Sequence, residues 1–167
     1  MLVSMAVDPE VREVVVAEGG LAGLTAYSRS EETRSQEEAA WALANLSARA
    51  ENAPLMVKAG VVQSMDRLLS CASPRVLMQA TWTLANLAVN PGIKEKMGSC
   101  GVLPSLIRVL EDERCRAAQT LDPKFQLDAD NSIVQATRTV ANLAVAPSNR
   151  QRIIAADGLD TLLALTR

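Results

Sequence analysis

The sequence predicts an all-α fold in which similar helical units stack on one another. One eight-residue segment occurs three times: AWALANLS (40–47), TWTLANLA (81–88) and TRTVANLA (137–144). The interval from Trp41 to Trp82 also separates Gly19 from Gly60 and Gly60 from Gly101. Apolar residues recur at helical spacing, and no run alternates over the length of a strand. A period of about 40 residues is typical of stacked helical repeats.

Composition agrees with this fold and indicates what fills its core. Hydrophobic residues make up 49% of the 167 residues, whereas aromatic residues make up 2%. The core must therefore be built from Ala, Leu, Val, Met and Ile, which suit close packing of helices. No linker rich in Gly, Pro or Ser divides the chain, so we expect a single domain over residues 1–167.

Each unit is expected to contain three helices, the first of which is short and ends at a glycine. Four glycines follow an apolar residue by four positions, as at the end of a helix. These pairs are Val15 and Gly19, Met56 and Gly60, Met97 and Gly101, and Ile154 and Gly158. After the glycine, a second helix is indicated by apolar residues at helical spacing. They are Val62, Met65, Leu68 and Leu69 in one unit and Leu103, Leu106, Val109 and Leu110 in the next.

The third helix of each unit carries the repeated segment. Pro74 suits its first turn in one unit, whereas residues 28–36 begin it without a proline in the unit before. The expected units span 8–48, 49–89 and 90–146, with the end of a preceding unit at 1–7 and a partial unit at 147–167.

Two faces of the third helix differ in chemistry. At about 100° per residue, Leu43 and Leu46 share one face, while Glu38, Trp41 and Asn45 share the other. We expect the leucine face to be buried in the core. A Trp and an Asn at i and i+4 are an unusual pair to leave outside, so the other face is a candidate binding surface.

These residues resemble the armadillo repeat, and the resemblance covers nearly the whole chain. The W-x-x-x-N pairs at 41–45 and 82–86 look most like the importin-α branch, and NLAVNPGIKEKM at 86–97 is similar to vacuolar and plant armadillo proteins. The resemblance implies a right-handed superhelix of three-helix units, here about three and a half repeats. It also implies that the third helices line a concave groove that binds an extended peptide.

Groove residues of this chain follow from the same resemblance. In the family, the asparagines hold the peptide backbone and the tryptophans pack against its side chains. An amide offers a donor and an acceptor, as a peptide group does, and an indole ring offers a face for Lys or Arg. The implied positions are Glu38, Trp41, Asn45, Gln79, Trp82, Asn86, Gln135, Arg138 and Asn142.

Departures from the family pattern argue against recognition of nuclear signals. Arg138 stands in the tryptophan place, and Gln79 and Gln135 stand where an acidic residue would help to bind Lys or Arg. We therefore expect a ligand with a basic or apolar end near Glu38 and Trp41 and an acidic end near Arg138. In the alternative interpretation, the asparagines tie neighbouring repeats together and the tryptophans fill the joints between them.

One repeat is longer than the others, because it carries an insertion between Leu110 and Ile133. Residues 111–121 (EDERCRAAQTL) are expected to extend the second helix, and residues 122–132 (DPKFQLDADNS) are expected to form a loop. Phe125, the only phenylalanine, is either an anchor on the solenoid or a partner, or part of a mobile acidic loop.

Charge and residue usage exclude several classes of function. The net charge of −2 argues against a general nucleic-acid-binding protein, which needs a basic stripe. The chain has no histidine, which removes Ser–His and Cys–His pairs and the commonest metal ligand, so we expect no catalysis, no metal and no cofactor. Cys71, Cys100 and Cys115 match neither a redox nor a zinc motif and are expected to be reduced and structural. No apolar run is long enough to span a membrane, so we expect a cytoplasmic or nuclear protein.

The function predicted from the sequence is that of a protein–protein interaction scaffold. Its partner would be a protein that offers an extended peptide segment. The alternatives are a regulatory or targeting region of a larger enzyme, such as a kinesin or a ubiquitin ligase, a nuclear-import-type adaptor, and a structural spacer whose groove binds nothing.

We predict that the chain is a piece of a longer array and that its ends associate. Residues 5–9 (MAVDP) align with 87–91 (LAVNP) at the same distance before a glycine, and 158–167 supply a second helix without a third. Both ends would then expose apolar faces that a neighbouring repeat should cover. Sedimentation velocity should detect self-association, and native flanking sequence should raise the melting temperature. A monodisperse monomer with a high melting temperature would contradict this prediction.

Overall fold

The computed structural model describes residue 16, residues 18–119 and residues 123–164, with the backbone alone at 114–119, 124 and 125. Every regular element in this part of the chain is a helix, which confirms the predicted all-α class. In order, the elements are α3 (Gly20–Tyr27), α4 (Thr33–Ser47), η1 (Ala50–Asn52), α5 (Ala53–Lys58), α6 (Val61–Leu68), α7 (Pro74–Ala88), α8 (Lys94–Ser99), α9 (Val102–Gln119), α10 (Pro123–Ala144), α11 (Pro147–Ala155) and α12 (Gly158–Ala164).

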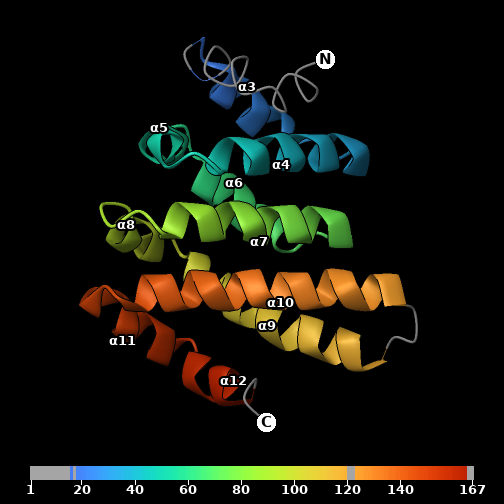
Figure 1. The fold of residues 1–167 in the computed structure, drawn as a ribbon, viewed down its shortest axis with the longest axis vertical. Coiled ribbons are helices and arrows are strands. Elements are labelled where there is room, and N and C mark those ends of the chain that lie inside the picture. Colours follow the sequence, from blue (N-terminus) through green and yellow to red (C-terminus); the bar gives the residue numbers. More distant parts are fainter. Residues whose placement is uncertain (1–15, 17, 120–122, 165–167) are drawn as a thin grey trace.

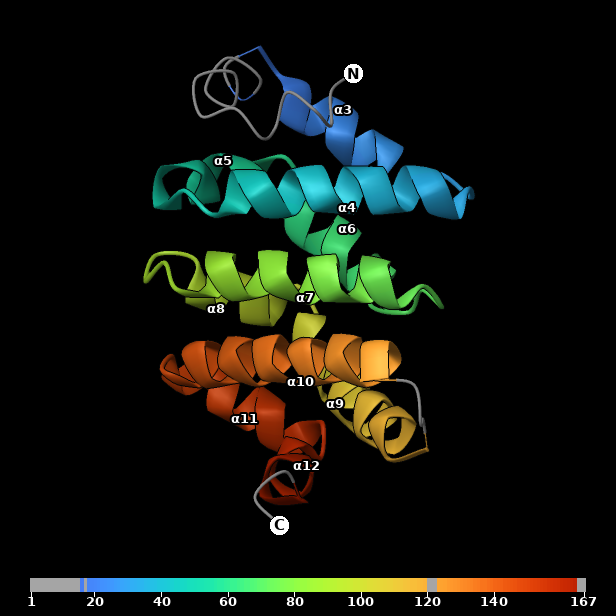
Figure 2. The same cartoon turned by 45° about the vertical axis from the view of Figure 1, so that its right-hand side comes forward.

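The helices form a stack in which one three-helix motif recurs. A short helix leads into a second helix and then into a long third helix, first as α5, α6 and α7 and again as α8, α9 and α10 (Figure 1). The long helices α4, α7 and α10 lie side by side as successive rungs, with α4 against α7 and α7 against α10 (Figure 2). Beyond the last rung, α11 packs on α10 and α12 packs on α9.

Aliphatic side chains fill the space between the helices. On α4, Leu43 and Leu46 are fully buried, whereas Trp41 and Asn45 are partly exposed, which confirms the two predicted faces. The largest fully buried side chains are Leu24, Leu43, Leu46, Met56, Met65, Leu68, Leu84, Leu87, Met97, Leu103, Leu106 and Leu110. At the C-terminal end of the stack, Leu159 and Leu163 of α12 are 52% and 59% exposed.

Glycine ends the first helix of two repeats, as the sequence predicts. Gly60 and Gly101 follow α5 and α8 with φ angles of 80° and 86°. Backbone in this left-handed region is strained for residues that carry a Cβ, so glycine lets the chain turn sharply into the second helix.

The sequence predicts that Gly158 ends a first helix as Gly60 and Gly101 do, and this prediction is wrong by one position. Asp157 takes the left-handed conformation with a φ of 56°, and Gly158 is the first residue of α12. The buried apolar residue four positions before this turn is therefore Ile153, which is 4% exposed, and not the predicted Ile154, which is 56% exposed. Glycine serves a different purpose here: a Cβ at Gly158 would lie 2.7 Å from the side chain of Ile107.

The insertion lengthens two helices instead of making a loop. As predicted, the second helix of this repeat is extended: α9 has 18 residues where α6 has 8. The predicted loop is wrong, because α10 begins at Pro123 and has 22 residues where α7 has 15. Proline fits the first turn of a helix, and Ala129, Ile133, Ala136 and Val140 continue the helical spacing toward it. No helix in the described ranges is both long and apolar enough to cross a membrane.

Polar side chains tie one repeat to the next at recurring positions. Arg67 and Arg108 occupy equivalent positions on successive second helices, and both reach back to the preceding repeat. The Arg67 Nη2 donates to the carbonyl oxygen of Ser28 at 2.6 Å, and the Arg108 Nη2 donates to Ser70 Oγ at 2.7 Å. Asn149 is fully buried, and its Nδ2 donates to the backbone oxygens of residues 94 and 143 at 2.9 and 3.0 Å.

We predict that Gly98→Ala destabilises the fold by about 1–3 kcal/mol. A Cβ at buried Gly98 would collide with the amide of Asn149 and break its two hydrogen bonds. Gly23→Ala is the matched control, because Gly23 is exposed on α3 with no atom within 4 Å of the added Cβ. That change should stabilise by about 0.5–1 kcal/mol. Urea unfolding of both variants provides the measurement, and equal stability of the two would contradict the packing argument.

Candidate functional site

The nine predicted groove residues lie on the three long helices, three on each. They are Glu38, Trp41 and Asn45 on α4, Gln79, Trp82 and Asn86 on α7, and Gln135, Arg138 and Asn142 on α10. Because these helices pack side by side, residues at equivalent positions form rows that cross from one helix to the next. We call this set of nine residues the ladder.

Exposure varies along the ladder. Trp82 is 45% exposed, while Trp41 and the three asparagines are partly buried. On α10 the pattern changes, because Gln135 is 8% exposed and its Oε1 accepts a hydrogen bond from Arg138 Nη1 at 2.9 Å. Gln135 therefore orients the exposed Arg138 instead of offering its own amide to solvent.

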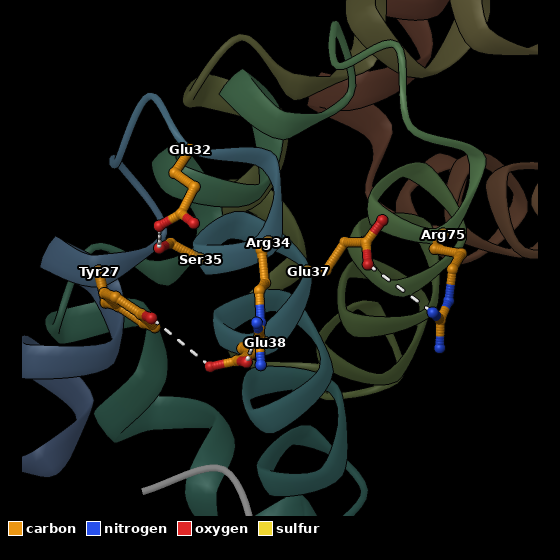
Figure 3. Close-up of polar contacts among 7 residues, drawn as sticks. All are labelled: Tyr27, Glu32, Arg34, Ser35, Glu37, Glu38 and Arg75. Atoms are coloured by element: carbon orange, nitrogen blue, oxygen red, sulfur yellow. Dashed lines mark hydrogen bonds and ion pairs between the residues drawn. The ribbon is translucent and has the colours of Figure 1, made fainter. Parts of the chain in front are cut away.

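A pocket of about 320 Å³ opens between α4 and α7 at one end of the ladder. Six side chains line it: Arg34, Glu37, Glu38, Trp41, Arg75 and Gln79. Two arginines and two glutamates give this pocket a formal charge of zero. Figure 3 shows the charged residues of the pocket, with Glu38 beside Arg34 and Glu37 facing Arg75.

The carboxylate of Glu38 is held on both sides. Its Oε1 accepts from Arg34 Nε at 3.3 Å, one turn earlier on α4, and its Oε2 accepts from the hydroxyl of Tyr27 on α3 at 3.5 Å (Figure 3). This carboxylate therefore faces the pocket with a cation already beside it.

Glu37 links α4 to the start of α7. Its Oε1 accepts from Ser73 Oγ at 2.8 Å, and its Oε2 lies 3.8 Å from Arg75 Nη1. Ser73 is also the N-cap residue of α7, where its Oγ accepts from the backbone N–H of Val76 at 3.5 Å. Glu37 is thus a structural link as well as a wall of the pocket.

Sequence reasoning missed Arg34 and Arg75 as site residues. They are separated by the same interval as Trp41 and Trp82, so they occupy the same position in successive repeats, and this interval was the available signal. Their pairing with Glu38 and Glu37 depends on side-chain geometry, and in the case of Arg75 on contact between two helices.

Asn86 takes part in a contact between repeats. Its Nδ2 donates to Ser47 Oγ at 3.0 Å, and the Ser47 hydroxyl donates to the backbone oxygen of Ala44 at 2.7 Å. This bond matches the alternative interpretation, in which the asparagines tie repeats together. It also fixes the direction of the amide, so that Oδ1 of Asn86 is held in one orientation. The residue equivalent to Ser47 is Ala88, so Asn142 has no such hydroxyl at that position.

Cys71 and Cys100 are free cysteines whose side chains are partly buried. Cys71 Sγ donates to Gln36 Oε1 at 3.2 Å, and Cys100 Sγ accepts from Gln63 Nε2 at 3.5 Å. Both contacts run between neighbouring repeats, which agrees with a structural role. The side chains of Cys115 and Phe125 lie outside the described residues, so the predictions for them remain untested.

We predict that Ser73→Ala destabilises the fold more than Arg75→Gln does. The Glu37–Arg75 pair is 30% and 73% exposed, and exposed ion pairs contribute at most about 1 kcal/mol. Loss of an N-cap side chain costs about 0.5–2 kcal/mol, and Ser73→Ala also removes the hydrogen bond to Glu37. Urea unfolding in low and high salt measures both effects. A larger loss for Arg75→Gln would show that the ion pair is the stronger link.

Comparison with known proteins agrees with the repeat architecture. A family model described as the armadillo/beta-catenin-like repeat matches residues 8–48 and 49–89. A search of curated protein sequences finds no match.

Several solved structures are similar to this chain. One engineered protein is 27% identical with a TM-score of 0.79, and the match covers 98% of this chain and 37% of that one. A designed armadillo repeat protein in complex with the peptide (KR)4 is 25% identical with a TM-score of 0.78, over 98% of this chain and 64% of that one. Another designed armadillo repeat protein, 24% identical with a TM-score of 0.80, supports the fold. The chain spans less than two thirds of the length of each of these proteins. The repeat match and the shared fold show that the chain belongs to the armadillo-repeat family.

Proposed function

We propose that the ladder binds an extended segment of a partner protein and that the chain acts as an interaction scaffold. The observation that carries this proposal is the recurrence of a partly exposed asparagine at the same position on α4, α7 and α10. Three amides on adjacent parallel rungs form a row to which a peptide backbone can bond. In this proposal the protein has no catalytic activity of its own and acts in the cytoplasm or the nucleus.

Backbone recognition follows from the chemistry of the amide. An asparagine side chain both donates and accepts, so it can pair with the N–H and C=O of one peptide unit without reading a side chain. The Asn86 amide is held by Ser47, which lowers the entropy that it loses on binding. Trp82, at 45% exposure, offers apolar area beside this row.

The likeness to a designed armadillo repeat protein in complex with (KR)4 supports an extended peptide as the ligand. It supports the manner of binding more than the basic sequence of that peptide. In this chain Gln79 and the buried Gln135 occupy places where a carboxylate would attract Lys or Arg, and Arg138 would repel them.

We predict that the double change Asn45→Ala with Asn86→Ala weakens binding of the partner at least several-fold. Each hydrogen bond from a side chain to peptide backbone contributes about 0.5–1.5 kcal/mol, so the loss of two corresponds to about 1–3 kcal/mol. The partner is recovered by co-purification from a native lysate and titrated by calorimetry.

The matched control is Gln151→Ala, which removes an exposed amide from α11. Circular dichroism and melting curves of all variants establish that the fold is intact. Affinity that is unchanged by the asparagine pair would place the partner elsewhere, on the convex face or near the α9–α10 connection.

A further inference from the structure

The ladder and its margin carry three arginines and two glutamates, and they are distributed unequally. Arg34 and Arg75 repeat at equivalent positions of α4 and α7, and Arg138 lies on α10. Both carboxylates belong to α4. Their counterparts on the other rungs are uncharged: Met78 and Gln79 on α7, and Val134 and Gln135 on α10. The charge of these residues therefore changes from negative on α4, which has one arginine and two glutamates, to positive on α7 and α10, which have one arginine each.

In both arginine–glutamate pairs the arginine is more exposed than the glutamate. Arg34 and Arg75 are 82% and 73% exposed, whereas Glu38 and Glu37 are 38% and 30% exposed. Each carboxylate has both oxygens occupied, by an arginine and by a hydroxyl. A guanidinium has five N–H donors, and each of these pairs uses one of them.

An incoming cation and an incoming anion therefore meet different obstacles. A Lys or Arg of the ligand would have to reach the less exposed glutamates and would meet the like charge of Arg34 or Arg75 beside them. A carboxylate can instead add to the unused donors of the same arginines without breaking either pair. This changes the expectation of a basic ligand end near Glu38.

The insertion extends an aliphatic strip next to Arg138. Leu127 and Val134 are 60% and 53% exposed, and their spacing places them within about 40° of Arg138 around α10. Val134 is one turn from Arg138, about 6 Å along the helix. Leu127 has no counterpart on α7, because α7 begins at Pro74, the position equivalent to Asp130. The regular repeat has only one of these two positions, because Met78 of α7 is the counterpart of Val134.

We propose that the bound segment is acidic and aliphatic, with carboxylates on Arg75 and Arg138 and aliphatic side chains on Val134 and Leu127. This rests on the proposed function and names the chemistry of its ligand. Asp128 and Asp130 lie about 80° to either side of Arg138 around α10, which keeps ligand carboxylates away from the start of the helix and leaves that region to apolar side chains.

Three blocked octapeptides test the proposal: two copies of Glu-Glu-Leu-Leu, two copies of Lys-Lys-Leu-Leu, and two copies of Gln-Gln-Leu-Leu. Successive side chains of an extended peptide point to opposite sides, so each peptide presents both leucines and the variable residue to the ladder, and the three differ only in charge. The Glu peptide should bind the whole chain at least about tenfold more tightly than the Lys peptide at low ionic strength. The difference should shrink in about 0.5 M salt, because exposed charges are screened.

Charge-reversal variants test whether the ladder arginines cause the preference for the Glu peptide. Arg138→Glu and Arg75→Glu should each weaken the Glu peptide by about tenfold and strengthen the Lys peptide. Lys96→Glu is the matched control, since it makes the same charge change at an exposed site on α8 and should leave affinities within about twofold. Val134→Ser should weaken all three peptides by a similar factor, whereas Ile154→Ser, an exposed site on α11, should weaken none.

The outcomes separate this proposal from the proposed function. If the Lys peptide binds as tightly as the Glu peptide, or if none of the three binds, the acidic class is wrong. If Asn45→Ala with Asn86→Ala nevertheless weakens a bound peptide or the co-purified partner, the ladder remains the binding site. If neither the asparagine pair nor the arginine variants change any affinity, both proposals fail.

Discussion

Close approach of the third helices is the constraint on which the rest of this molecule depends. The residues at positions equivalent to 40 and 42 are all Ala or Thr on α4, α7 and α10, and those described as buried at these positions include Ala40, Ala42, Thr81, Thr83 and Thr139. Small side chains beside the tryptophan position let neighbouring helices pack closely, within the roughly 8–10 Å usual for helix pairs. The threonine hydroxyls donate to their own helices, as from Thr83 to the backbone oxygen of Gln79 at 2.8 Å, so they need no partner across the joint.

That spacing also sets the scale of what the ladder can hold. An extended chain rises about 3.3 Å per residue, so a rung spacing of about 10 Å corresponds to two or three residues of a bound segment. Bonds between repeats, such as those from Asn86 to Ser47 and from Ser73 to Glu37, keep the rungs in register. A surface fixed before binding loses little conformational entropy, which favours recognition of a flexible peptide.

The sequence contained most of the fold, because the recurring interval between repeats and the helical spacing of apolar residues can both be read directly along the chain. The prediction was wrong where a proline was given more weight than the spacing of apolar residues. Pro123 suggested a loop, although Ala129, Ala136 and Val140 already have the helical spacing of α10. The ladder residues could be placed on helices from their repetition alone. The arginine–glutamate pairs could not, since the pair of Glu37 and Arg75 joins residues of different repeats through a contact between two helices.

A row of asparagines that holds peptide backbone provides affinity that tolerates many sequences, so selectivity must come from positions where the repeats differ. In this chain the differences are concentrated on one rung. Arg138 replaces a tryptophan, Gln135 is buried beneath it, and the lengthened α10 adds Leu127 to the face that carries the exposed Val134. All of these follow from the same repeat, the one that carries the insertion. In the proposed function, the regular repeats therefore provide affinity for peptide backbone in general, and the repeat with the insertion determines which segment binds most tightly.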